Sequence, residues 1–240
     1  MPIINLVYEA PTPYQWDELC FTANTANSTV QLTKNGSPTS VTLETTTDWV
    51  NWTTYTMGDT ITLSNIWDKV YRRNTSTTDT WFSLGYNTNY YQFATSWSLA
   101  CSWDVNYLLN KNSTTTVSDY CYCRLFRQTD ITTPPKFLAT TLGILSYLQM
   151  FYGCTKLETL PSLSALAYPE RCCESMFYNC SKIKINTIKQ WIYQTEYRIP
   201  TTWTGTAGSY AFRYMFTGTW GSYTGNAQIN TTYYTSNTVI

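Results

Sequence analysis

Apolar and polar residues alternate along most of the first half of the chain. Leu19 and Phe21, and then Val30 and Leu32, stand two positions apart, the spacing of residues on one face of a β-strand. Asn35-Gly36 is a hairpin signal and predicts that SVTLET pairs with the strand before it. Short apolar segments then recur about every ten residues: VNWTTYT, DTITLSNI, KVYRRN and NYYQFATSWSL. The pattern predicts a β-sandwich domain over residues 17–112.

The first sixteen residues do not share this alternation. Pro2, Pro11 and Pro13 disfavour both helix and the interior of a sheet. We therefore expect residues 1–16 to form an extended arm that docks into a larger assembly.

A different period begins near Val117. Phenylalanine recurs at 126, 151, 177 and 216, with intervals of 25, 26 and 39 residues. Two further positions repeat with it, one three residues after the phenylalanine and one six residues after. A period in the twenties is typical of a leucine-rich-repeat solenoid, whose coils bury their apolar side against one another. The predicted repeat core of residues 113–190 consists of Phe126, Phe151, Cys154, Leu157, Phe177, Cys180 and Ile183.

Local structure within one repeat also follows from the pattern. Leu142, Leu145, Leu148 and Phe151 recur every three residues and predict a short helix that Gly153 ends. The following KLETLP predicts a short strand with its leucines facing inward. Residues 191–240 retain one Met-Phe unit and then become rich in Gly, Thr and Tyr, which predicts a polar capping region.

Charge and hydropathy exclude two classes of partner. Lys plus Arg equals Asp plus Glu at 15 each, and charged residues are 12% of the chain, so we expect no nucleic-acid binding. The most apolar run, LGILSYLQMF, falls short of the ~20 residues that a membrane span needs. The N-terminus carries no basic start followed by an apolar core, so we expect no secretory leader and synthesis in the cytosol.

Eight cysteines leave three interpretations open. No C-x-x-C pair and no histidine is present, so the usual zinc spacings are missing. Cys121-x-Cys123 and Cys172-Cys173 remain possible ligands for a soft metal, and a disulfide framework is a second interpretation. Buried free thiols that pack as small apolar side chains are the favoured one. We expect no metal and no cofactor.

The repeat resembles a known family. The CY-x-x-MF-x-GC-x-x-L core and the P-x-L-x-A linker are similar to BspA-like (Treponema-type) leucine-rich repeats, and the segment from Leu19 to Asn74 is similar to the β-rich module that often precedes them. Such repeats occur in surface proteins of gut and oral bacteria and in phages of gut bacteria, including crAss-like phages. The resemblance implies a scaffold or binding surface and leaves the biochemical role open.

Tryptophan departs from this family pattern at five turn-like positions where glycine is expected: Trp49, Trp67, Trp103, Trp203 and Trp220. Positive φ costs glycine nothing, whereas tryptophan there would be strained. One hypothesis is that these are UGA codons read as Trp in a recoding genome, one nucleotide from the glycine codon GGA. The alternative is a lineage whose turns tolerate tryptophan.

Catalysis has little support in the sequence. The chain has no histidine to act as general base, no G-x-S-x-G and no phosphate-cradling glycine loop. Paired carboxylates could hydrolyse a glycosidic bond, but nothing in the sequence brings two of the nominal candidates together: Asp17, Glu18, Glu44, Asp48 and Asp59. We expect a protein that is not an enzyme.

The favoured function is a structural or binding component of a phage virion, such as a head or tail fibre or a decoration protein, at the virion surface. Its expected partners are other virion proteins and a host glycan or protein receptor, and homotrimers are expected by analogy with fibres. The alternative is a bacterial cell-surface adhesin. Aromatic side chains suit such contacts because they offer large area at low entropy cost, and the candidates are Tyr86, Tyr90, Tyr91, Trp97, Tyr223, Tyr233 and Tyr234. Each could instead be a half-buried cross-strand residue.

Overall fold

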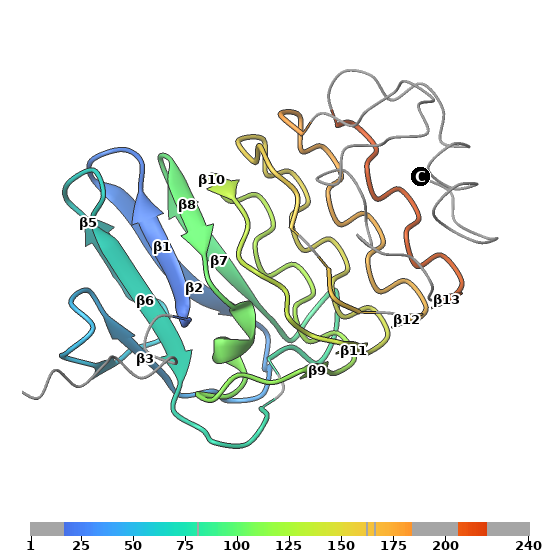
Figure 1. Ribbon diagram of the computed structural model, residues 1–240, viewed down its shortest axis with the longest axis horizontal. Helices are drawn as coiled ribbons and strands as arrows, with labels where there is room; N and C mark the ends of the chain where they lie inside the picture. Colours follow the sequence, from blue (N-terminus) through green and yellow to red (C-terminus); the bar gives the residue numbers. More distant parts are fainter. Residues whose placement is uncertain (1–16, 81, 162, 166, 184–205, 220–240) are drawn as a thin grey trace, which may run out of the picture.

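The computed structural model describes residues 17–80, 82–161, 163–165, 167–183 and 206–219. As predicted, the protein is mainly β, and η1 (Val105–Leu108) is the only helical segment within those ranges. Figure 1 shows two sheets at one end of the molecule and a series of stacked coils at the other. The strands are β1 (Leu19–Ala23), β2 (Ser28–Asn35), β3 (Leu43–Thr46), β4 (Thr53–Thr54), β5 (Thr60–Leu63), β6 (Lys69–Asn74), β7 (Tyr90–Ser96), β8 (Leu99–Ser102), β9 (Thr116–Val117), β10 (Ile131–Thr133), β11 (Thr141–Leu142), β12 (Ala167–Tyr168) and β13 (Thr206–Ala207).

Two sheets form the N-terminal part. One has the order β10-β8-β1-β6-β3-β4, and the other has the order β5-β2-β7. Alternation directs Phe21 of β1 and Val30 of β2 inward, where both are fully buried. The sheets meet through Phe21 and Phe93, whose ring centroids lie 4.9 Å apart in an edge-to-face contact.

The predicted hairpin at Asn35-Gly36 is wrong. Gly36 does turn the chain with φ 70°, but β2 pairs with β5 and β7, while β3 pairs with β6 and β4 in the other sheet. The chain therefore crosses between sheets after the turn. This crossing lets Leu43 of β3 join the core between the sheets, where it is 1% exposed.

A buried cation lies between the two sheets. Arg72 of β6 is fully buried, and none of its three side-chain nitrogens has a hydrogen-bond partner among the described residues. Its guanidinium lies 3.8 Å from the ring centroid of Tyr55. Burial lowers the pKa of Arg72 to about 10, against a weaker opposing effect of Tyr55. The charge is therefore stabilised mainly by aromatic rings.

Each coil contains a zigzag of overlapping turns. In the first coil, alternate backbone N–H groups donate to the carbonyl three residues earlier, as from Leu125 to Tyr122 at 3.2 Å, and the others donate to the next coil, as from Phe126 to Met150 at 2.9 Å. The second and third coils repeat this pattern, and φ is positive at every fourth residue of each zigzag. The coils are thus joined by their backbones along the whole zigzag.

This zigzag replaces the predicted helix. Leu145 and Leu148 pack with Cys123 in a small cluster of their own, on a different side of the chain from Leu142 and Phe151, which join the main core. Gly153 does have positive φ, at 74°, but it ends a run of turns. The predicted strand KLETLP is also absent, although its first leucine is fully buried.

A column of phenylalanine rings runs through the coils. Phe126 and Phe151 stack at 5.4 Å, and Phe151 and Phe177 stack at 5.5 Å, as their spacing predicts. Phe216 continues the column at 5.6 Å from Phe177, across the longer interval of 39 residues. Residues 206–219 of the predicted capping region therefore form a further coil, and β13 pairs in parallel with β12.

The column of phenylalanine rings starts within the sheets. Phe93 of β7 stacks on Phe126 at 5.1 Å, and its N–H donates to the carbonyl of Leu125 at 2.7 Å. The N–H groups of Phe126, Phe151 and Phe177 donate to the following coil in the same way. One hydrophobic cluster contains residues of both sheets and of all four coils. The predicted boundary after residue 112 therefore falls within one continuous core.

All eight cysteines are free and buried, as the favoured interpretation holds. In the repeat core, the thiol of Cys154 donates to the carbonyl of Phe126 at 2.9 Å, and the thiol of Cys180 donates to that of Phe151 at 3.0 Å. Leu157 and Ile183 are buried beside them. Each thiol therefore ties its coil to the one before it.

Tryptophan adopts left-handed backbone at three of the five positions where glycine was expected. The φ values are 68° at Trp49, 74° at Trp67 and 65° at Trp103. Trp97, which the pattern did not single out, has φ 63°. Trp203 and Trp220 lie outside the described residues.

Candidate functional site

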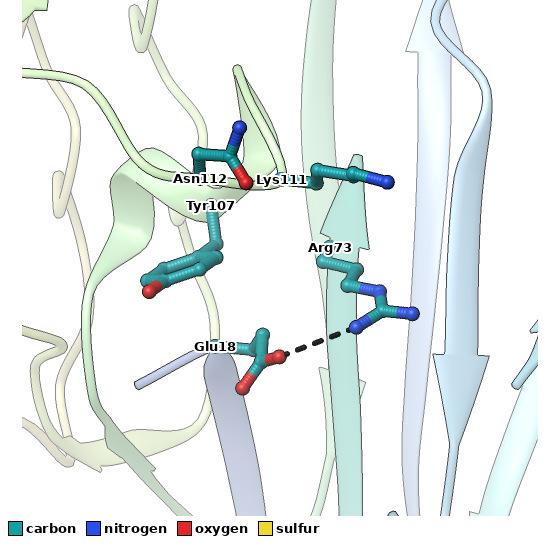
Figure 2. A pocket seen from close by; sticks show the side chains of 5 residues that line it. All are labelled: Glu18, Arg73, Tyr107, Lys111 and Asn112. Atoms are coloured by element: carbon teal, nitrogen blue, oxygen red, sulfur yellow. Dashed lines mark hydrogen bonds and ion pairs between the residues drawn. The ribbon is translucent and has the colours of Figure 1, made fainter. Parts of the chain in front are cut away.

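A pocket of about 440 Å³ opens on the outer face of the six-stranded sheet, next to the start of β1. Its lining comes from three elements: the residue before β1, strand β6, and η1 with the loop after it. Figure 2 shows the lining residues Glu18, Arg73, Tyr107, Lys111 and Asn112, which we call the Glu18 pocket. Its volume lies within the ~300–1,000 Å³ of small-ligand sites.

The floor is a row of charges across the sheet. The antiparallel register of β1 and β6 places Glu18 beside Arg73, and the register of β6 and β3 places Glu44 on the other side of Arg73. Arg73 lies 3.5 Å from a Glu18 oxygen and 3.0 Å from a Glu44 oxygen. Its guanidinium also lies 3.8 Å from the ring centroid of Trp52. Arg73 is therefore fixed by partners on three sides.

The wall is held by backbone and capping interactions. Asp104 accepts from the N–H of Asn106 at 3.0 Å and from the hydroxyl of Ser113, which closes the loop after η1. The backbone N–H of Lys111 donates to Ser76, and that of Asn112 donates to the side chain of Asn110. The Lys111 and Asn112 side chains thus project from an anchored loop, and Figure 2 shows them with Tyr107 above Glu18.

Glu18 has an unused acceptor at this site. The residue is only 6% exposed, yet its Oε2 has no hydrogen-bond partner among the described residues. Burial raises the pKa of the Glu18 carboxyl, against the opposing effects of its own backbone N–H and of Arg73. A buried acceptor without a donor costs free energy. A ligand with a hydroxyl or amino group could supply that donor.

An aromatic surface continues from the pocket along the same sheet face. Trp49 packs on Tyr71 with centroids 4.0 Å apart and on Trp52 at 6.2 Å. Trp52 in turn lies against Arg73. Half-buried indole rings therefore lie beside the charged floor of the pocket.

The predicted aromatic candidates are scattered by the fold. Tyr86 is 37% exposed and Trp97 is 60% exposed, whereas Tyr90 and Tyr91 are buried. The hydroxyl of Tyr91 donates to the carbonyl of Thr39, which fits a core residue. Tyr223, Tyr233 and Tyr234 lie outside the described residues. None of the described candidates lines the Glu18 pocket.

The fold brings together two of the carboxylates considered for hydrolysis, which the sequence alone could not do. Glu18 and Glu44 meet on Arg73, from strands far apart in the sequence. Asp48 accepts hydrogen bonds from its own loop, which lower its pKa. In the described ranges, no three Asp, Glu, Cys or His residues gather as a metal site would require.

Burial raises the pKa of several thiols. It raises the pKa of Cys121 and of Cys123 to about 12 and that of Cys180 well above its ordinary value. These thiols stay protonated at neutral pH and are poor nucleophiles.

Comparison with protein-family models, curated proteins and solved structures finds no match to this chain. A search of the described residues also finds no helix long and apolar enough to cross a bilayer.

Proposed function

We propose that this protein is a non-enzymatic structural and binding protein of a phage virion, a head or tail fibre or a decoration protein. In this proposal it presents a surface for attachment to a host glycan or receptor. The architecture that we propose is an N-terminal β-sandwich continued by a short BspA-like leucine-rich-repeat solenoid with a terminal cap.

The observation that carries the proposal is the unbroken phenylalanine column from Phe93 to Phe216. It joins sheets and coils in one core, which suits a rigid spacer that holds a binding surface at a fixed distance. Hinged cleft closure, which many enzymes use, would have to break this column.

The outer surface supports a role in binding. The Glu18 pocket combines an unused acceptor, an ammonium group and the neighbouring indole ring of Trp52. Aromatic surface beside anchored polar groups is typical of recognition sites. Residues 1–16, which precede this face, are the segment that we propose to dock into the particle, and a homotrimer is the assembly that fibres suggest.

Adsorption assays test this proposal. Fab fragments raised against the purified protein should bind intact particles of the source phage and slow their adsorption to host cells. Purified protein should compete with the particles for the same cells. Particles that bind no Fab and adsorb normally beside excess protein would contradict the proposal.

A further inference from the structure

We propose that the Glu18 pocket binds one hexose unit of a glycan through the sugar's hydroxyl groups. This inference deepens the proposed function and rests on it only in taking the glycan to come from the host.

The pocket holds polar groups that a ligand could bind. Among the described residues, Glu18 Oε2 is a buried acceptor without a donor, and the exposed Lys111 and Asn112 side chains line the same cavity. Glu18 is also fixed in place, since its other oxygen faces Arg73. The site therefore offers an acceptor and donors on opposite walls, within one cavity (Figure 2).

The pocket presents positive and negative groups side by side. Charges of both signs lie close together: Glu18, with Asp17 and Glu44 near it, is negative, and Arg73 and Lys111 are positive. A neutral ligand whose neighbouring groups both donate and accept fits this pattern, and adjacent sugar hydroxyls have that property. A simple anion would leave Glu18 without a donor, and a simple cation would face Lys111.

The shape of the pocket also suits a sugar ring. The ~440 Å³ cavity has room for a small ring but opens to solvent, as a site for one unit of a longer chain must. Tyr107 lines one wall, and Trp52 lies just beyond Arg73, so an apolar ring face is available next to the polar groups.

Titration with methyl glycosides tests the inference. Methyl α-glycosides of glucose, galactose, mannose and N-acetylglucosamine are added to the full chain, and binding is followed by NMR shifts and calorimetry. At least one should bind with a Kd of about 1 mM, and Glu18→Gln should weaken it by about 10–100-fold. Lys111→Met, on an exposed side chain, should weaken it by about tenfold.

Glu158→Gln is the matched control, because Glu158 is a surface carboxylate paired with Lys182 on the coils and does not line the pocket; it should leave Kd within about twofold. Far-UV circular dichroism checks that each variant is folded. Any of three results would overturn the inference. They are no binding of any glycoside at a concentration about 100-fold above ~1 mM, equal binding by Glu18→Gln and the parent, and binding of free glycine when no glycoside binds. These measurements use purified protein, so they are independent of whether the chain is found on particles.

The tryptophan backbone carries a second inference: we infer that the codons of Trp49, Trp67, Trp97 and Trp103 are UGA and that the source organism inserts glycine there. Four of the five tryptophans that the structure describes have positive φ, as do four of the seven described glycines. Outside the zigzags of the coils, the described residues other than glycine with positive φ are Asn27, Asn89, Ser113 and these four tryptophans. Asparagine tolerates this backbone, whereas bulky residues adopt it least often. Tryptophan thus occupies glycine's backbone positions in this chain.

Trp52 is the internal control. It is the one described tryptophan without positive φ, and its ring packs on Arg73 and Trp49. We expect UGG at codon 52 and UGA at the other four. Peptide mass spectrometry of the native protein should find Trp at 52 and Gly at 49, 67, 97 and 103.

Recombinant variants provide a further readout. Trp67 and Trp97 are 73% and 60% exposed, so replacing either with glycine removes strain at little packing cost and should raise Tm by about 2–4 °C. Trp52→Gly should lower Tm. UGG codons at the four positions, tryptophan in the native peptides, or a lower Tm in both glycine variants would overturn the inference.

Discussion

Replacing Phe151 with alanine tests the aromatic column at its centre. Phe151 is fully buried and stacks on Phe126 at 5.4 Å and on Phe177 at 5.5 Å, with Phe137 edge-on at 5.9 Å. A buried Phe→Ala change costs about 3–5 kcal/mol, and each aromatic pair adds about 0.5–1.5 kcal/mol beyond buried area. We therefore expect a loss of about 4–5 kcal/mol in the free energy of unfolding, near the upper limit for one substitution.

Urea denaturation followed by circular dichroism and by tryptophan fluorescence measures this loss. The matched control is Tyr152→Ala, since Tyr152 is the next residue and stacks on Tyr178 at 4.8 Å but is only half-buried. The control should cost about 1 kcal/mol. Because one core joins sheets and coils, both probes should report a single transition in the parent protein.

A double-mutant cycle then isolates the contact. Phe126 and Phe151 touch, so their alanine substitutions should couple by about 0.5–1.5 kcal/mol. Phe126 and Phe177 are separated by a whole coil, so that pair should be additive within about 0.5 kcal/mol. Equal costs for Phe151→Ala and Tyr152→Ala, or equal coupling in both cycles, would refute the column as the source of stability.

Other predictions follow from buried groups and from the proposed arm. Arg72→Met should raise the free energy of unfolding. Burial lowers the pKa of Arg72 to about 10, which corresponds to about 3 kcal/mol of destabilisation, and cation–π attraction offsets only about 2 kcal/mol of that cost. If urea melts show a destabilised variant, the Arg72 charge must be paired. Iodoacetamide at pH 8 should label none of the eight thiols in the folded protein and all of them in urea, and rapid labelling of folded protein would contradict their burial. Burial raises the folded-state pKa of Glu18 above its unfolded value, so the contribution of Glu18 to stability falls as pH rises through the folded pKa. Glu18→Gln should flatten that part of the curve of stability against pH. An unchanged curve would count against a raised pKa of Glu18. Deleting residues 1–16 should leave a soluble folded chain that no longer enters particles, and normal incorporation would exclude a docking role.

Sequence periodicity predicts the column because residues that stack on themselves must recur at the length of one coil. The intervals of 25 and 26 residues place Phe126, Phe151 and Phe177 in line, and burial of Cys154 and Cys180 follows from the same register. Phe93 also belongs to the column, although Gln92 stands before it where the later phenylalanines follow Leu or Met. It was missed because β7 reads as a strand of the sheets, and its interval to Phe126 is longer.

Local patterns fail where a distant partner decides the conformation. Asn35-Gly36 does turn the chain, but the partners of β2 are set by apolar inner faces on β5 and β7. An i, i+3 apolar spacing predicts a helix at Leu142–Phe151, whereas every second N–H there bonds the neighbouring coil. The Glu18 pocket was not predictable, because Glu18 and Arg73 are 55 residues apart and only the strand register brings them together.

Mass spectrometry of gradient-purified particles, beside the envelope fraction of the uninfected host, tests the central claim most directly. The proposed function predicts that peptides of this chain are present in the particle fraction in many copies and absent from the host envelope. Recovery of the chain from the host envelope, with none in the particles, would contradict it and would favour the bacterial adhesin.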